Sequence, residues 1–448
     1  MNANRGGTVV PPLFPFQEEY AVNTPLFHAL NAFADTDPLR MHMPGHKGKG
    51  LPGWEQLERL DFTELPPTGN LYEAGGAIGE AETLWAAAFG MQNCLMLTCG
   101  STQGIHSALT LTCPVGSALL ADRNCHRSVY HTMALLDLTP VYLMEKTPAG
   151  VEKMLENHPE IKTVCITSPN YYGTLYDVTG ISAVCHRFGA KLVVDGAHGA
   201  HLPFLGIDHY RGADLVICSA HKTLPALGQA ALLFSGGAYS GDDLRRAASI
   251  HGTSSPSYPI LASMDLARVW MESEEGQERY QLACRRVKEL RQKFPALNGD
   301  CLDPGRLTLR VNDGHEVERR LQEQGIWPEM ADSGHVVFIV TGADNMEELD
   351  RLEQALDALD LQEDDREYPM PPLPEIVLRP RQALFATAEE LPLDQCEGYI
   401  SAEQIAPYPP GVPVVAPGEV ITKKHLAYLR EIGYNNRNVR ICHEYGRV

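Results

Sequence analysis

The chain has 448 residues, of which 44% are hydrophobic and 21% are charged, a composition typical of a globular protein with two or three domains and a large core. Its formal net charge of −20 argues against nucleic acid as a partner, and we find neither a signal sequence nor an apolar run of the roughly 20 residues that cross a membrane. The 11 cysteines form no CxxC pair, so we expect reduced cysteines, no bound metal and a cytoplasmic location.

Residues 1–75 are predicted to form an N-terminal arm. One short helix is expected near Thr24–Asp35, and Pro and Gly clusters such as Met43–Gly50 indicate loops around it. We do not expect an arm so rich in loops to fold by itself.

Residues 76–300 are predicted to form a large α/β domain in which strands alternate with helices. The predicted strands are Cys94–Thr98, Ser117–Ala121, Val141–Met144, Thr163–Thr167, Lys191–Asp195, Leu215–Ser219 and Ala230–Phe234. The predicted helices are Ala81–Phe89, the stretch that ends at Leu111, His126–Leu136 and a long helical connection over residues 245–290. This alternation indicates a mostly parallel sheet with helices on both faces, which binds its ligands beyond the strand ends.

Residues 301–365 are predicted to form a smaller α+β domain. Its expected elements are the strands Leu307–Val311 and Val336–Val340 and the helices Glu316–Gln324 and Met346–Leu359. The acidic, Pro-rich stretch Asp364–Pro374 indicates a linker. Residues 366–448 are then predicted to form a C-terminal segment or domain, in which residues 406–413 hold too many prolines for a helix or a central strand.

One predicted strand of the sheet leads into Ser219-Ala-His-Lys-Thr223. A lysine at the end of a buried strand is costly unless its charge is removed or used, and such lysines are often neutral nucleophiles that form Schiff bases. A surface lysine is the alternative. The neighbouring Ser219 and His221 favour the functional interpretation of Lys222, because a hydroxyl and an imidazole beside the lysine can hold a cofactor phosphate.

A second predicted strand ends at Asp195 and leads into Gly-Ala-His198. The carboxylate could cap a following helix. Alternatively, it pairs with a pyridine nitrogen, because a pyridoxal phosphate site requires a lysine for the aldehyde and a carboxylate for this nitrogen. Ala197 is small enough to pack on the cofactor ring, and His198 is a further candidate for cofactor binding.

Other candidates follow other predicted strands. Gly100, Ser101 and Thr102 lie between a strand and a helix, where backbone N–H groups and the helix dipole favour a phosphate, although such residues also begin ordinary helices. His126 begins the next helix and is either structural or stacked on the pyridine ring. Thr167 could reach the hydroxyl of that ring.

Segments along nearly the whole chain match one pattern of motifs. They are Met41–Lys47, Phe62–Leu65, Cys99–Thr102, Arg123–Ser128, Ser168–Gly173, Val194–His201, Ser219–Leu224, Thr253–Tyr258, Pro328–Asp332 and Ala402–Pro413. Together they resemble the Orn/Lys/Arg decarboxylase family, the bacterial basic amino acid decarboxylases with fold type I. Each motif alone is weak, but their combination is highly specific.

The resemblance implies an aspartate aminotransferase-like α/β fold, pyridoxal 5'-phosphate as cofactor, and decarboxylation of a basic L-amino acid to an amine and CO2. It implies that Lys222 carries the cofactor and that Asp195 pairs with the ring nitrogen. It also implies that His126 stacks on the ring, and that either Lys222 or His221 returns a proton to Cα. The residues it assigns to the phosphate are Ser101, Thr102, Ser219 and His221.

The resemblance further implies a homodimer or an assembly of dimers, with the N-terminal arm packed against the partner. Thr253 or Ser254 would then contact the cofactor of the neighbouring subunit. The chain is similar to the short form of the family, which lacks the N-terminal wing domain, and this similarity favours arginine as substrate. Lysine and ornithine remain possible.

The sequence departs from the family at two places. Gly196 stands where Glu is common, and Pro66–Tyr72 replaces a more acidic loop. Both flank the predicted cofactor site and leave the substrate open. Two alternatives also remain: another pyridoxal phosphate reaction on the same fold, such as aminotransfer, racemisation or elimination, and a catalytically idle homologue that binds the cofactor.

Overall fold

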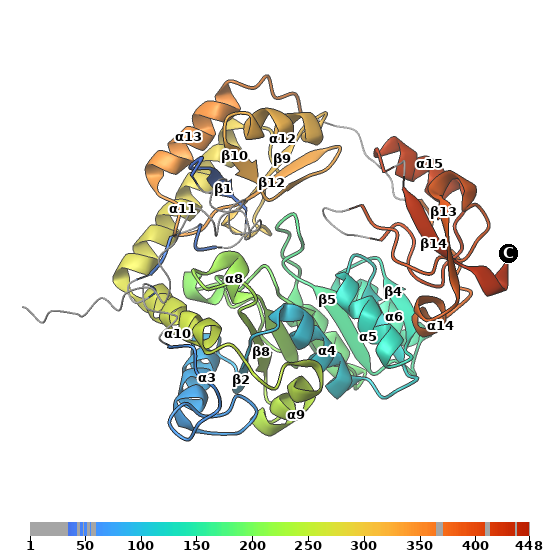
Figure 1. Cartoon of the computed structure of the whole chain (residues 1–448), viewed down its shortest axis with the longest axis horizontal. Helices are drawn as coiled ribbons and strands as arrows, with labels where there is room; N and C mark the ends of the chain where they lie inside the picture. The colour runs from blue at the N-terminus through green and yellow to red at the C-terminus, as the bar shows by residue number, and fades with distance from the viewer. Residues whose placement is uncertain are drawn as a thin grey trace, which may run out of the picture.

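The computed structural model describes residues 35–42, 45–47, 49–51, 54, 60–363, 371–407, 413–434 and 437–447. Nearly all of the predicted helix Thr24–Asp35 and much of the predicted linker Asp364–Pro374 lie outside these residues. The described elements gather around a central sheet, a small unit built on β9 and β12, and a C-terminal unit built on β13 and β14 (Figure 1).

A seven-stranded sheet forms the centre of the fold, with the strand order β2-β8-β7-β6-β5-β3-β4. Its strands are β2 (Asn93–Leu97), β3 (Ala118–Asp122), β4 (Thr139–Leu143), β5 (Thr163–Thr167), β6 (Lys191–Asp195), β7 (Leu215–Cys218) and β8 (Ala231–Ser235). β8 runs antiparallel to both of its neighbours and the other pairs are parallel. The prediction of a mostly parallel sheet is therefore confirmed. Every residue of β7 and β8 is buried, which explains their continuous apolar sequences.

Helices cover this sheet. They are α3 (Gly76–Ala88), α4 (Gly100–Thr112), α5 (Arg127–Leu135), α6 (Pro148–Asn157), α7 (Val178–Arg187) and α9 (Gly241–His251). α4 packs against β6, β7 and β8 and also contacts α5 and α9 (Figure 1). The predicted helices and strands of this part are present, with ends shifted by a few residues.

The helical connection expected over residues 245–290 is divided among α9, α10 (Tyr258–Glu272) and α11 (Glu274–Lys293). α10 begins with a proline in its first turn. Ser273 then ends α10 and caps α11, because its side chain accepts a hydrogen bond from the N–H of Gly276. Buried residues of α11, including Val287 and Leu290, belong to the hydrophobic cluster of the small unit.

The small unit has the predicted α+β character. β11 (Met330–Ala331), β12 (His335–Ile339) and β9 (Arg306–Arg310) form an antiparallel sheet, accompanied by α12 (Gly314–Gln322) and α13 (Met346–Asp357). The sequence did not predict β1 (Leu39–Met41), which pairs in parallel with β10 (Ile326–Pro328). The N-terminal arm therefore adds a strand to the small unit.

The C-terminal unit contains the antiparallel pair β13 (Ala388–Pro392) and β14 (Asn438–Cys442), with α14 (Pro380–Leu384) and α15 (Lys423–Glu431). The sequence did not predict these elements one by one. A buried ion pair joins this unit to the central one: Nη1 and Nη2 of Arg123 donate to the two carboxylate oxygens of Glu419 at 2.5 and 2.9 Å. The domain limits at residues 75, 300 and 365 remain predictions.

Candidate active site

Lys222 lies on α8 (Ala220–Thr223), a single helical turn that follows β7. The sequence placed this lysine at a strand end; in the structure β7 stops at Cys218, and the chain turns into α8 at Ser219. The Nζ of Lys222 lies 3.2 Å from Nε2 of His198. Burial lowers the pKa of Lys222, and the charge of Asp195 partly opposes this shift. An amine held toward its neutral form is the nucleophile that a Schiff base needs.

Asp195 ends β6 and is 3% exposed. No α-helix follows it, because residues 196–202 form turns that lead into the 3-10 helix η2 (Pro203–Leu205), so the helix-cap interpretation does not hold. Its Oδ1 accepts a hydrogen bond from the N–H of Ala197 at 3.2 Å. Burial raises the pKa of Asp195, and the charge of Lys222 lowers it. A buried carboxylate thus faces the lysine across the ends of neighbouring strands.

His198 connects Lys222 to the small unit. Its Nδ1 lies 3.2 Å from Nη2 of Arg306, at the start of β9, and the ring of Tyr171 meets its ring edge-on at 4.8 Å between centroids. The sequence interpretation missed both neighbours as site residues. Tyr171 lies within a matched motif, but Arg306 lies 108 residues from His198 in another unit, and no local pattern pointed to it.

Two hydroxyl groups near these residues have no hydrogen-bond partner within the part of the chain that the structure describes. The Oγ of Ser219, a fully buried residue, and the Oγ1 of Thr167 are buried without a hydrogen bond. Buried polar groups are normally paired, so two unpaired hydroxyls beyond β5 and β7 indicate places where a ligand's oxygen atoms would bind. His221 lies two residues after Ser219. Its Nδ1 is 2.9 Å from the carbonyl oxygen of Ala230, and burial lowers its pKa to about 4.

The N-terminus of α4 has the character predicted for an anion site. α4 begins at Gly100, whose φ of +73° is in the left-handed region that favours glycine. The preceding residue, Cys99, makes no side-chain cap, so no side chain at this position satisfies the backbone N–H groups of the first turn. Ser101 is partly exposed and Thr102 is exposed.

His126 lies immediately before α5, as predicted. Its Nδ1 accepts hydrogen bonds from the Ser128 N–H and hydroxyl at 3.3 and 2.9 Å. Burial lowers the pKa of His126 to about 4, and the charge of Lys222 adds to the effect. The imidazole therefore belongs to the same electrostatic environment as the lysine, and it is neutral at neutral pH.

The departure at Gly196 has a structural explanation. A Cβ at this position would lie 2.6 Å from the hydroxyl oxygen of Tyr210, a buried residue. The Tyr210 ring therefore occupies the space that a larger side chain at residue 196 would need. Gly45 is similarly confined, since its N–H donates to the carbonyl of His221 at 2.7 Å and a Cβ would lie 2.8 Å from the Leu224 carbonyl oxygen. The N-terminal motif thus packs against the lysine turn.

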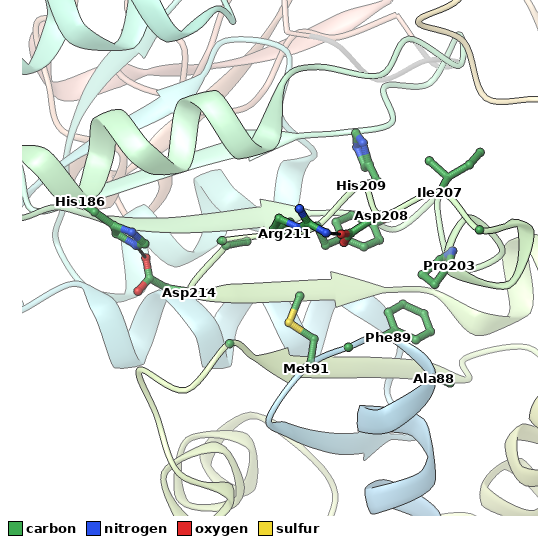
Figure 2. A pocket seen from close by; sticks show the side chains of 16 residues that line it. Ala88, Phe89, Met91, His186, Pro203, Ile207, Asp208, His209, Arg211 and Asp214 are labelled. Carbon is green, nitrogen blue, oxygen red and sulfur yellow. Dashed lines mark hydrogen bonds and ion pairs between the residues drawn. The ribbon is translucent and has the colours of Figure 1, made fainter.

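A cavity of about 670 Å³ lies at a different place (Figure 2). Its lining includes His186 and Asp214, which are hydrogen-bonded at 2.9 Å between Nε2 and Oδ2. Asp214 precedes β7, whereas Lys222 follows β7, so this part of the cavity lies at the opposite edge of the sheet. None of the predicted cofactor-binding residues lines it.

Among the described residues, no group of three or more His, Cys, Asp or Glu side chains is placed to hold a metal ion. None of the helices in the described ranges is both long and apolar enough to cross a bilayer.

The sheet topology, together with a lysine and a carboxylate at the ends of neighbouring strands, defines a pyridoxal phosphate enzyme of fold type I. The structure of the E. coli constitutive lysine decarboxylase matches with a TM-score of 0.72 at 21% identity, over 95% of this chain and 83% of that one. A Pseudomonas fluorescens L-threonine transaldolase shares the fold, with a TM-score of 0.60 at 14% identity over 76% of this chain and 89% of that one. The unpaired hydroxyls of Ser219 and Thr167 fit a cofactor with phosphate and hydroxyl oxygens.

The comparison with protein-family models identifies this chain more specifically than the fold does. Residues 24–309 match the Orn/Lys/Arg decarboxylase major domain, and residues 364–438 match its C-terminal domain. The chain therefore belongs to the Orn/Lys/Arg decarboxylase family and is a pyridoxal phosphate-dependent decarboxylase of basic amino acids. Protein YaaO of Bacillus subtilis is 30% identical over 92% of this chain and 94% of its own length. An arginine decarboxylase of B. subtilis is 29% identical over 91% and 93%, and the constitutive lysine decarboxylase of Escherichia coli is 25% identical over 83% and 69%.

Proposed function

We propose that this enzyme decarboxylates arginine to agmatine and CO2. The observation that favours arginine is end-to-end similarity: the B. subtilis relative named arginine decarboxylase aligns over 91% of this chain and 93% of its own length. The E. coli relative named constitutive lysine decarboxylase is less similar and aligns over 69% of its length. Lysine and ornithine are the competing substrates.

We assign the cofactor residues as follows. Lys222 binds the aldehyde, Asp195 pairs with the ring nitrogen, and His126 and Ala197 pack on the two faces of the ring. His198 and Thr167 lie toward the ring hydroxyl. The phosphate is held by the N-terminus of α4, which begins at Gly100, and by the side chains of Ser101, Thr102 and Ser219. His221 is not assigned to the phosphate, because the one proton of its neutral ring is directed at the Ala230 carbonyl. The proximity of Lys222, His198 and Asp195, and the unpaired hydroxyls described above, support this assignment.

When bound, pyridoxal phosphate supplies a conjugated ring that takes up the electron pair left at Cα as CO2 departs. Asp195 contributes a buried negative charge that keeps the ring nitrogen protonated. Its low exposure matters because a charge pair is stronger where water is excluded. The neutral form of Lys222, favoured by burial, has the lone pair that a bond to the cofactor aldehyde would require.

Geometry favours Lys222 over His221 as the group that returns a proton to Cα. Neutral His221 carries one ring proton, and its Nδ1 lies 2.9 Å from the carbonyl oxygen of Ala230, which only accepts hydrogen bonds. The proton is therefore on Nδ1 and is directed at the backbone, so Nε2 has none to give. Because burial lowers the pKa of His221 to about 4, the doubly protonated form is rare in this environment at neutral pH.

The enzyme is proposed to act as a homodimer, with Thr253 or Ser254 contacting the cofactor of the neighbouring subunit. Both residues are exposed in the single chain, in the turn between α9 and α10. Ile250, at the end of α9, is 67% exposed, and a large apolar side chain beside these residues suits a subunit interface. Light scattering at assay concentration should give a dimer or a larger assembly, and an active monomer would contradict the proposal.

The substrate is tested with cofactor-loaded enzyme incubated separately with arginine, lysine and ornithine. Arginine should have a kcat/KM at least tenfold above the others, or about 1.4 kcal/mol in transition-state binding. A planar guanidinium and a compact ammonium make different hydrogen bonds, so a fixed pocket separates them. Faster release of cadaverine or putrescine than of agmatine would overturn the assignment of arginine but not the decarboxylase class.

A further inference from the structure

His198 lies between two cationic side chains. Its Nε2 is 3.2 Å from Nζ of Lys222, and its Nδ1 is 3.2 Å from Nη2 of Arg306. His198 is 4% exposed and Arg306 is 1% exposed. Water therefore has little access to either ring nitrogen, and these two contacts decide where the imidazole proton resides.

A guanidinium donates hydrogen bonds and accepts none, and it stays protonated in proteins. The Nδ1 of His198 must therefore be the acceptor in its contact with Arg306 and carries no proton. A neutral imidazole has one ring proton, which is then on Nε2. Burial and the charge of Arg306 hold the pKa of His198 well below its usual value, so the ring is neutral. Lys222, His126 and His221 would lower this pKa further when they are protonated.

The consequence reaches Lys222. An Nε2–H directed at Nζ requires a lone pair on that nitrogen, and only the neutral amine has one. Burial and the charge of Arg306 lower the pKa of Lys222, whereas Asp195 and Glu329 raise it. The hydrogen-bond geometry and the electrostatics thus agree on a free amine at Lys222.

Arg306 is itself held in place by its surroundings. Its Nη1 donates to the carbonyl of Tyr171 at 3.3 Å, and its Nη2 lies 3.7 Å from Oδ2 of Asp303. Asp303 accepts hydrogen bonds from His201 at 2.7 Å and from the Gly305 N–H at 2.9 Å. Although burial opposes ionisation, His201 and Arg306 lower the pKa of Asp303 to about 2, so the carboxylate stays charged.

We infer that Arg306, anchored by Asp303, is a positioning residue that fixes His198 as its Nε2–H tautomer and thereby presents a hydrogen-bond donor, never an acceptor, at Lys222. This rests on the proposed function in one respect, that Lys222 is the cofactor lysine. The two contacts of His198 link the small unit to the lysine, since Arg306 is on β9 and Lys222 follows β7 of the central sheet.

The tautomer can be measured in the cofactor-free, full-length protein with histidine labelled with ¹⁵N and ¹³C, in which the His198 signals are identified by their loss in His198→Gln. At pH 7 the wild type should show a neutral ring protonated on Nε2. Arg306→Met should add the Nδ1–H tautomer, and Arg306→Lys, which keeps a cation that only donates, should restore the wild-type pattern. A wild-type His198 protonated on Nδ1, or on both nitrogens, would overturn the inference without the need for an Arg306 variant.

A second readout is the rate at which pyridoxal phosphate loads onto the cofactor-free protein. Loss of the Arg306 cation raises the pKa of Lys222 and so protonates more of the amine, and loading at pH 7 should be measurably slower. Arg291→Met is the matched control, because Arg291 donates to the carbonyls of Asp303 and Arg306 without contacting His198. This variant should leave the His198 tautomer and the rate of cofactor loading unchanged. If Arg291→Met slows loading as much as Arg306→Met does, the inference is refuted. Peptide mapping after borohydride reduction separates failure of the proposed function from failure of this inference. If the cofactor is attached to another lysine, both are wrong. If the cofactor is attached to Lys222 but the His198 tautomer is unaltered in Arg306→Met, only the inference is wrong.

Discussion

Replacing Asp195 with Asn tests the proposed pairing of this carboxylate with the cofactor ring. The substitution preserves shape, and the amide oxygen can still accept the hydrogen bond from the Ala197 N–H. The change is therefore confined to charge at a site that is 3% exposed. A hydrogen bond involving a charged group contributes about 1.5–3 kcal/mol. Without this contribution, the transition state in which negative charge moves into the ring is less stable, so kcat should fall about 10- to 150-fold.

The assay measures amine release at saturating substrate, together with the visible absorbance of bound cofactor. Cofactor content should stay close to wild type, because the phosphate contacts and Lys222 are intact. Asp214→Asn is the matched control: Asp214 is also a buried carboxylate, but it lies at the opposite end of β7 and accepts hydrogen bonds from Lys191 and the Leu192 N–H. A kcat for Asp195→Asn within twofold of wild type would refute the ring pairing.

Three further predictions follow from single features of the structure. Lys222→Ala should abolish both turnover and the yellow colour of the purified protein, and a variant that stays yellow after dialysis would contradict the assignment. Gly196→Ala should lower the free energy of unfolding by about 1–3 kcal/mol in urea titrations, because its Cβ would lie 2.6 Å from the Tyr210 hydroxyl. Adding Tyr210→Phe to this variant should recover part of the loss. If Gly196→Ala is equally stable with and without Tyr210→Phe, the steric explanation is wrong. His126 and His221 have pKa values lowered from 6.5 to about 4, so between these values the unfolded chain binds protons that the folded protein does not. The cofactor-free protein should therefore lose stability as the pH falls from 6.5 to 4, by up to about 3 kcal/mol for His221 and by less for His126, whose exposed side chain is screened by solvent. Urea titrations in which His221→Asn keeps the full acid-induced loss would contradict this.

The sequence predicted those parts of the site that follow directly from strand ends. Parallel strands place their carboxyl ends at one edge of a sheet, so Asp195 after β6 and Lys222 after β7 could be expected to meet. The comparisons confirm the fold, the cofactor and the family. The exact helical turn at Lys222 was not predicted, because a single turn of helix leaves no periodic pattern in the sequence.

Contacts between distant segments account for what the sequence did not reveal. Arg306 reaches His198 from the small unit across 108 residues, and β1 pairs with β10 although a strand of three residues is too short to give a distinctive pattern in the sequence. The conflict between residue 196 and Tyr210 likewise depends on packing of the folded chain. Such contacts are set by tertiary structure and not by local propensity.

The most direct test of the account is to identify the products formed from arginine by the cofactor-loaded enzyme. The enzyme should release equimolar CO2 and agmatine, and Lys222→Ala should release neither. The proposed function would be contradicted if no basic amino acid released CO2 above background while another amino acid was transaminated or underwent elimination.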